Sequence, residues 1–216
     1  MPKRVLILSP HTDDGSLGVG GTMYRLRRRG VRVVNVAFSL CRKSVPKEFP
    51  SDVHREEFLE ACRRLGVEAI VLDYPNRVFP SIRQRICQEI YNLRLEYDPD
   101  VVFCPHIQDS HQDHWIVARE ALSVFKRDTS ILMYEIMFNC PTFTPNVYFT
   151  LSREDVEKKI EALKAYKSIW GTKRFPHLTE EFILASARFR GLQFNTEYAE
   201  AFYTPKMNLL HWMGEK

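Results

Sequence analysis

Two short polar segments of the sequence carry side chains that could bind a metal ion and move protons. The first, residues 9–15 (S-P-H-T-D-D-G), supplies one imidazole and two carboxylates. The second, residues 109–114 (D-S-H-Q-D-H), supplies two imidazoles and two carboxylates. Two histidines and one Asp or Glu around an open position are a ligand set that catalytic Zn²⁺ uses. If the two segments meet in the fold, the sequence predicts such a site.

Each polar segment follows a predicted buried strand. Residues 4–8 (RVLIL) form a short continuous apolar run, which is typical of a strand covered on both faces. Residues 98–105 (DPDVVFCP) contain a proline break and then another such strand. Further strands are predicted at 31–38, 67–74 and 130–137, with helices at 16–29, 51–65, 81–97 and 114–126. This alternation predicts an α/β fold: a Rossmann-like, doubly wound, mostly parallel sheet flanked by helices.

The C-terminal third is less regular. A strand at 146–151, a charged helix at 152–168 and a further helix at 178–190 are predicted there. The sequence shows no internal repeat, low-complexity tract or linker, so we expect a single domain over residues 1–216.

The predicted topology brings the two polar segments together. In an open parallel α/β sheet, ligands bind outside the carboxyl ends of the strands, where the strand order reverses. The reversal commonly flanks the first strand and makes the fourth its neighbour. Either segment alone is a weak signal, but both at paired strand ends favour a metal site. Asp113 is either a hydrogen-bonding partner of one imidazole or the N-cap of the following helix.

Nucleotide binding is disfavoured at the same place. A phosphate-binding loop presents glycines and backbone N–H groups, whereas this one presents two carboxylates that would repel phosphate. The glycines after the first strand do not complete G-x-G-x-x-G, because position 23 is Met.

Composition sets broad limits on the class of protein. The chain has 216 residues, of which 44% are hydrophobic and 27% charged, which is ordinary for a soluble globular protein. The net charge of +4 does not indicate a nucleic-acid partner, and the arginines of 25–32 are interpreted as a solvated helix end. Five cysteines without a C-x-x-C pair indicate reduced thiols. No apolar stretch is long enough for a signal peptide or a membrane span, so we expect a cytoplasmic protein.

The residues around the two polar segments resemble a known family, the PIG-L/LmbE-like zinc-dependent N-acetylglucosaminyl de-N-acetylases. The resemblance rests on P-H-T-D-D-G-S-L-G-V-G-G-T at 10–22 and on H-Q-D-H at 111–114. It continues in the family's order through residues 54–67, 159–168 and 187–202, and therefore spans nearly the whole chain.

The resemblance implies a role for each polar residue. It makes His11, Asp14 and His114 the zinc ligands, and Asp13 the general base beside the metal. It places His111 against the substrate carbonyl, where it would stabilise the oxyanion or protonate the departing amine.

The same resemblance implies a substrate class and shows two departures. Arg55 matches a family position that is linked to substrate binding. The implied reaction is hydrolysis of an N-acetyl group on an amino sugar within a glycan, glycolipid, sugar nucleotide, or antibiotic or thiol precursor.

The family's common first motif is H-P-D-D-E, whereas Thr12 and Gly15 replace its Pro and Glu here. Neither is a ligand position, so we expect metal binding to survive. Similar proteins often assemble as homo-oligomers, and assembly stays open.

Four alternatives are weighed against zinc hydrolysis. The same ligand types bind Fe²⁺ in oxygenases, and another divalent ion would also fit, so the metal's identity stays open. A non-catalytic or altered-specificity sugar-binding protein is encouraged only by Gly15. Serine hydrolysis is disfavoured because G-x-S-x-G is absent. A cysteine nucleophile could be Cys41 or Cys104, but a buried thiol is the favoured role.

The remaining histidines are interpreted as structural or surface residues. They are His54, His106, His177 and His211. Among them His106 lies nearest in sequence to the second polar segment.

Overall fold

The strands form one sheet whose order places the site segments side by side. The structure is a computed structural model that describes residues 1–213, and within this range seven strands form a sheet in the order β3-β2-β1-β4-β5-β7-β6. The strands are β1 (Arg4–His11), β2 (Arg32–Ser39), β3 (Glu68–Val71), β4 (Val101–Pro105), β5 (Ser130–Tyr134), β6 (Val147–Leu151) and β7 (Tyr198–Lys206). The first five run parallel, whereas β7 is antiparallel to both β5 and β6. The predicted α/β fold with a mostly parallel sheet is confirmed.

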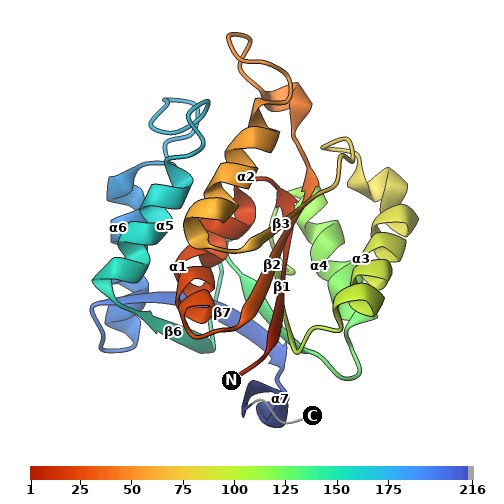
Figure 1. Cartoon of the computed structure of the whole chain (residues 1–216), viewed down its shortest axis with the longest axis vertical. Helices are drawn as coiled ribbons and strands as arrows, with labels where there is room; N and C mark the ends of the chain where they lie inside the picture. The colour runs from red at the N-terminus through yellow and green to blue at the C-terminus, as the bar shows by residue number, and fades with distance from the viewer. Residues whose placement is uncertain (214–216) are drawn as a thin grey trace.

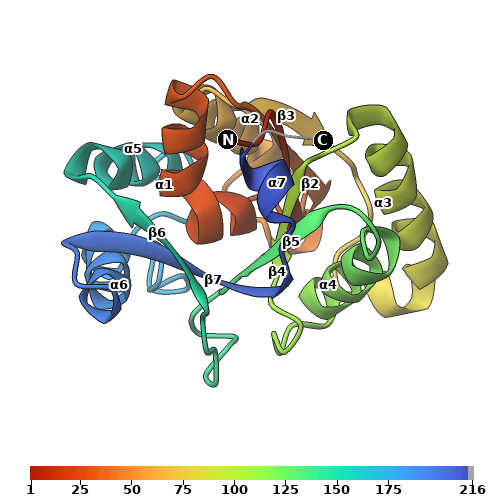
Figure 2. The ribbon, with the colours of Figure 1, turned by 90° about the horizontal axis from the view of Figure 1, so that it is seen from below.

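Helices cover both faces of the sheet. One face carries α1 (Asp14–Arg28), α2 (Val53–Leu65), α5 (Arg153–Leu163) and α6 (Glu180–Gln193), and the other carries α3 (Arg83–Tyr97) and α4 (Gln112–Val124) (Figures 1 and 2). Two 3₁₀ helices, η1 (Arg42–Ser44) and η2 (Phe79–Ile82), lie in connecting loops, and α7 (Leu209–Met213) lies near the chain termini. Among the helices of residues 1–213, none has the length and apolar character that crossing a bilayer requires.

The apolar run of β1 is explained by this layering. Val5 and Ile7 belong to the core under α1, α2 and α5, whereas Leu6 and Leu8 belong to the core under α3 and α4. Successive side chains of a strand point to opposite faces, so a strand buried on both faces has apolar residues throughout. All four side chains are at most 2% exposed.

The strand order reverses at β1, as predicted. β1 pairs with β2 on one side and with β4 on the other. The segments that follow β1 and β4 therefore leave the same edge of the sheet, the upper edge in Figure 1, opposite the N-terminus. This edge positions the site.

One strand, β7, was not predicted from the sequence. Its third residue, Glu200, is a buried carboxylate that breaks the expected apolar pattern. Glu200 accepts hydrogen bonds from the backbone N–H groups of Gly21 and Thr22 and forms an ion pair with Lys159. These partners compensate the buried negative charge of Glu200. They lie far from it in sequence, so no pattern within the strand predicts them.

Candidate functional site

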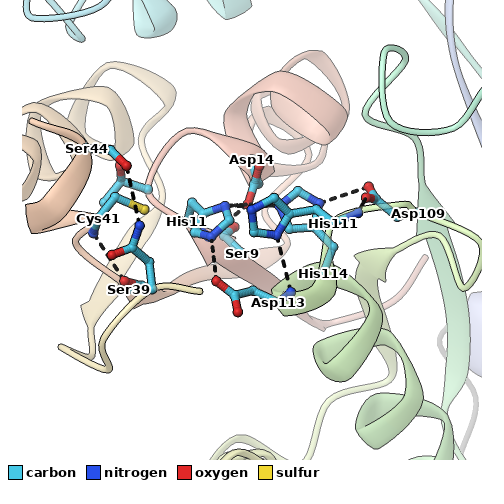
Figure 3. A network of polar contacts seen from close by, with 12 residues as sticks. Ser9, His11, Asp14, Ser39, Cys41, Ser44, Asp109, His111, Asp113 and His114 are labelled. Carbon is cyan, nitrogen blue, oxygen red and sulfur yellow. Dashed lines mark hydrogen bonds and ion pairs between the residues drawn. The ribbon is translucent and has the colours of Figure 1, made fainter. Parts of the chain in front are cut away.

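Three side chains from the two predicted segments converge on one point. Asp14 Oδ2 lies 3.2 Å from His11 Nδ1 and 3.2 Å from His114 Nε2. The two imidazole nitrogens lie 3.0 Å from each other. The predicted meeting of the β1 and β4 loops therefore occurs (Figure 3), and it brings together the three residues expected to bind the metal.

Two buried carboxylates orient the imidazoles. Asp113 Oδ2 lies 3.2 Å from His11 Nε2, and Asp109 Oδ2 lies 2.9 Å from His114 Nδ1. A carboxylate accepts hydrogen bonds, so the outer nitrogen of each ring carries its hydrogen. Asp113 thus acts as a partner of one imidazole, whereas the N-cap of α4 is His111. Outer carboxylates of this kind fix the ring orientation of metal-binding histidines.

The donor set fits a divalent metal ion. With the outer nitrogens protonated, neutral His11 and His114 direct bare lone pairs at each other and at Asp14. A positive charge between them, such as a bound metal ion, relieves this arrangement. Tetrahedral zinc, with bonds of about 2.0–2.1 Å, holds its ligand atoms roughly 3.3–3.4 Å apart, and the observed spacings are within a few tenths of an ångström of that value.

A second set of three donors competes with this one. Nitrogen atoms of His11, His111 and His114 lie within 4.8 Å of one another. His111 Nδ1, however, accepts the backbone N–H of Asp113 at 3.2 Å as the cap of α4. Asp14 is closer to both other ligands and brings a negative charge. We therefore favour Asp14 over His111 as the third ligand.

The pKa values of the three residues show how strongly the site attracts positive charge. Burial alone would lower the pKa of His11, but the carboxylates of Asp14 and Asp113 raise it to about 9. Burial would likewise lower the pKa of His114, but Asp14 and Asp109 raise it to about 10. Burial would raise the pKa of Asp14, whereas the two imidazoles lower it strongly. A divalent ion would replace the protons that these groups otherwise hold.

The pKa values of Asp13 and His111 are shifted in the opposite directions to those of Asp14 and of the other two histidines. Burial, and then the neighbouring charge of Asp14, raise the pKa of Asp13, so its carboxylate accepts a proton more readily than an exposed one. Burial and the imidazoles of His11 and His114 lower the pKa of His111 to about 4. Because its Nδ1 caps α4, neutral His111 carries its hydrogen on Nε2. One residue is thus suited to take a proton and the other to donate a hydrogen bond.

Buried tyrosines hold the backbone of the first segment in place. The hydroxyl of Tyr134 donates to the carbonyl of Leu8 at 2.9 Å, and that of Tyr166 donates to the carbonyl of Thr12 at 2.6 Å. Asp14 also accepts the backbone N–H of His11 at 2.8 Å. The backbone is therefore anchored on both sides of His11.

An open cavity lies over these residues. Its lining includes the five site residues His11, Asp13, Asp14, His111 and His114, and it adds polar and aromatic residues from other loops. The additional residues are Thr12, Cys41, Ser44, His54, Asn76, Arg77, Phe138, Asn139, Ile169, Arg174, Phe175 and His177.

Two of the histidines interpreted as structural or surface residues line this cavity. His177 packs against Phe138 with ring centroids 4.1 Å apart. His54 is 3% exposed, and its Nδ1 lies 3.1 Å from the carbonyl oxygen of Leu40, to which it donates. Its Nε2 is buried and has no hydrogen-bond partner within the described residues, which leaves an unsatisfied polar atom beside the cavity. Sequence reasoning missed both because neither follows a strand that carries metal ligands.

Other predicted residues lie elsewhere. Arg55 is exposed on α2 and is not in the cavity lining, so its role in substrate binding stays a prediction. His106 is buried and packs against the rings of Phe143 and Tyr203. The arginines of 25–32 lie at the opposite end of α1 from Asp14, where Arg25, Arg28 and Arg32 pair with carboxylates. The side chain of His211 is outside the described part of the structure.

Gly15 is explained by packing. A Cβ atom at this position would lie 2.2 Å from Ser9 Oγ and 2.8 Å from Asn35 Oδ1. These two buried side chains hydrogen-bond to each other at 2.7 Å beneath the start of α1. A side chain at position 15 would thus meet the sheet, so the missing Glu gives no support to a non-catalytic protein.

Substituting Asp109 should weaken metal binding. In Asp109→Asn the group facing His114 loses its charge, and we expect the metal dissociation constant to rise about 10- to 100-fold. Competition with a chromophoric chelator measures this constant. Asp128→Asn, an exposed residue paired with Arg94, is the matched control and should bind metal as the unchanged protein does. Equal affinity in both variants would show that Asp109 does not support the metal site.

The chain is similar to known proteins over most of its length. Residues 6–125 match a family model described as PIG-L: GlcNAc-PI de-N-acetylase. The uncharacterized deacetylase YaiS of Escherichia coli (strain K12) is 27% identical over 172 residues, which cover 77% of this chain and 91% of that protein.

Two solved structures have the same fold. The conserved protein TT1542 from Thermus thermophilus superposes with a TM-score of 0.79 at 26% identity, over 96% of each chain. The N,N'-diacetylchitobiose deacetylase from Pyrococcus horikoshii superposes with a TM-score of 0.81 at 25% identity, over 97% of this chain and 86% of that one.

Proposed function

The chain belongs to the PIG-L family, and on that premise we propose that it is a metal-dependent hydrolase that removes the acetyl group from an N-acetylated amino sugar. The observation that carries the proposal is the convergence of His11 Nδ1, Asp14 Oδ2 and His114 Nε2 beside an open cavity, with Asp13 and His111 next to them. We further propose that the site belongs to a single deacetylase domain over residues 1–216.

The residues fit amide hydrolysis. His11, Asp14 and His114 would hold the divalent ion, with Zn²⁺ the ion that the donor set favours. When bound, such an ion polarises the amide carbonyl and lowers the pKa of water. Asp13 would take the proton of the attacking water and pass it to the amine nitrogen as the C–N bond breaks, which leaves acetate and a free amine. His111 would donate its Nε2 hydrogen to the oxyanion.

The cavity offers further contacts to a sugar. His54 Nε2, a buried nitrogen without a partner among the described residues, would accept a hydrogen bond from a substrate hydroxyl, and the packed rings of His177 and Phe138 offer an apolar face.

A screen of N-acetylated sugars tests this function. The panel contains GlcNAc, N,N'-diacetylchitobiose, GlcNAc-1-phosphate and UDP-GlcNAc, and the readout is released primary amine and acetate in equal amounts. We expect at least one substrate to be deacetylated, the activity to be lost in a chelator and to return with Zn²⁺. The same panel incubated without the protein gives the background. Activity that a chelator leaves unchanged would contradict the metal's role, and no amine from any sugar would contradict the deacetylase.

A further inference from the structure

Two arginines that line the cavity have no carboxylate partner among residues 1–213. Arg77 lies between β3 and η2, and Arg174 lies between α5 and α6. Both are exposed, and within residues 1–213 neither forms an ion pair. Other arginines that follow or flank the strand ends do have partners: Arg42 pairs with Asp73, and Arg83 with Glu120. The guanidinium groups of Arg77 and Arg174 are thus available to a ligand in the cavity.

The backbone of Arg77 is held in an unusual conformation by the second polar segment, residues 109–114. Its φ of 67° lies in the left-handed region, which a residue with a Cβ rarely adopts. Its N–H donates to Asp113 Oδ2 at 2.6 Å, and its carbonyl accepts from Gln112 Nε2 at 2.6 Å. Such strained residues persist where their surroundings enforce them, and they cluster at ligand sites. Asp113 therefore connects Arg77 directly to His11.

Arg174 is held at the cavity by an aromatic ring. Its guanidinium carbon lies 5.5 Å from the ring centroid of Phe175, which also lines the cavity. The loop that carries both residues is anchored by Glu57, which accepts the backbone N–H and the hydroxyl of Ser168, each at 2.7 Å. Arg174 thus extends from an anchored loop that is far along the chain from the loop of Arg77.

The charge and shape of these groups suit an anion. A guanidinium binds phosphate or carboxylate through paired N–H donors, and such charged hydrogen bonds are stronger than neutral ones. The carboxylates in the described lining are Asp13 and Asp14, whose charge a bound divalent ion would balance. The two arginines then leave the cavity positive overall.

We propose that Arg77 and Arg174 form an anion-binding subsite, and that the substrate is an N-acetylated amino sugar bearing a phosphate or carboxylate group. This rests on the proposed function, and it assigns substrate specificity to residues outside the two polar segments that carry the metal ligands. Arg77 is a binding residue whose backbone is held by Asp113, the same side chain that contacts His11.

The test compares neutral and anionic sugars with variants of the two arginines. The neutral sugar is methyl N-acetylglucosaminide, the phosphate arm uses GlcNAc-1-phosphate and UDP-GlcNAc, and the carboxylate arm uses N-acetylmuramic acid. Arg77→Gly suits the left-handed backbone, so this variant keeps the turn and removes the side chain. Arg174→Ala removes the second charge. Lys173→Ala, an exposed neighbour outside the cavity lining, is the control for net charge.

We expect kcat/KM of the metal-loaded protein to be at least about tenfold higher for one anionic sugar than for the neutral one. Arg77→Gly and Arg174→Ala should each raise KM for that anionic sugar about tenfold or more, with kcat and the neutral sugar changed less than about twofold. Lys173→Ala should change none of these values. The arm that shows the preference distinguishes phosphate from carboxylate.

Calorimetry supplies a readout that needs no turnover. GlcNAc-1-phosphate and N-acetylmuramic acid are each titrated into the metal-loaded protein, and we expect one of them to bind at least about tenfold more weakly to Arg77→Gly. Equal affinities in the two proteins for both sugars, or neutral and anionic substrates used equally well, would overturn the subsite while leaving deacetylation intact. Absence of turnover with binding still dependent on Arg77 would instead contradict the proposed function alone.

Discussion

Replacing Asp13 with asparagine is expected to lower kcat at least about a hundredfold while the amount of bound metal stays that of the unchanged protein. The carboxylate lines the cavity beside the metal ligands. Burial and the charge of Asp14 raise its pKa, which favours transfer of a proton from water. An amide at this position keeps the shape and cannot take that proton.

The measurement combines steady-state kinetics with elemental analysis of the same protein sample. Asp52→Asn, a substitution at an exposed residue that also removes one negative charge, should leave both values unchanged. If Asp13→Asn keeps its full turnover, Asp13 has no part in proton transfer. If it loses the metal as well, Asp13 is a ligand, and the base must be sought elsewhere.

Replacing either Asp14 or His114 with alanine is expected to empty the metal site. Each change leaves two of three donors, so we expect bound metal after dialysis to fall below about a tenth of the unchanged protein's. Activity should fall with it. Circular dichroism checks that the variants are folded, since Asp14 also accepts the backbone N–H of His11.

Two further variants test why the metal is lost in these proteins. Asp14→Asn retains an oxygen that can accept the His11 N–H, so it separates loss of the ligand's charge from loss of the hydrogen bond. His106→Gln changes a nearby buried histidine that is outside the cavity lining and should keep its metal. Full metal content in both Asp14→Ala and His114→Ala would refute the ligand assignment.

The meeting of the two polar segments could be predicted because it follows from the topology of the sheet. The apolar runs at β1 and β4, with helices between them, indicate a doubly wound sheet, and such sheets bind ligands where the strand order reverses. That rule alone brings His11 near His114 across about a hundred residues of chain. The same reasoning could not choose between two roles for Asp113, since orienting an imidazole and capping a helix both suit that position. The structure assigns the cap to His111.

The rest of the cavity could not be predicted because no strand pattern points to it. Arg77 follows the edge strand β3, which ends at Val71 although the sequence predicted it to residue 74. Arg174 and His177 lie in an irregular loop after α5. The side chains that face a cavity from such loops depend on long-range anchors such as Glu57 to Ser168, and these leave no periodic signal along the chain.

Anomalous X-ray diffraction from crystals grown with Zn²⁺, measured on both sides of the zinc absorption edge, tests the central claim most directly. The predicted result is an anomalous peak bonded to His11 Nδ1, Asp14 Oδ2 and His114 Nε2, with a remaining position open to the cavity. A peak coordinated instead by the imidazoles of His11, His111 and His114 without Asp14, or no peak at this edge of the sheet, would contradict it.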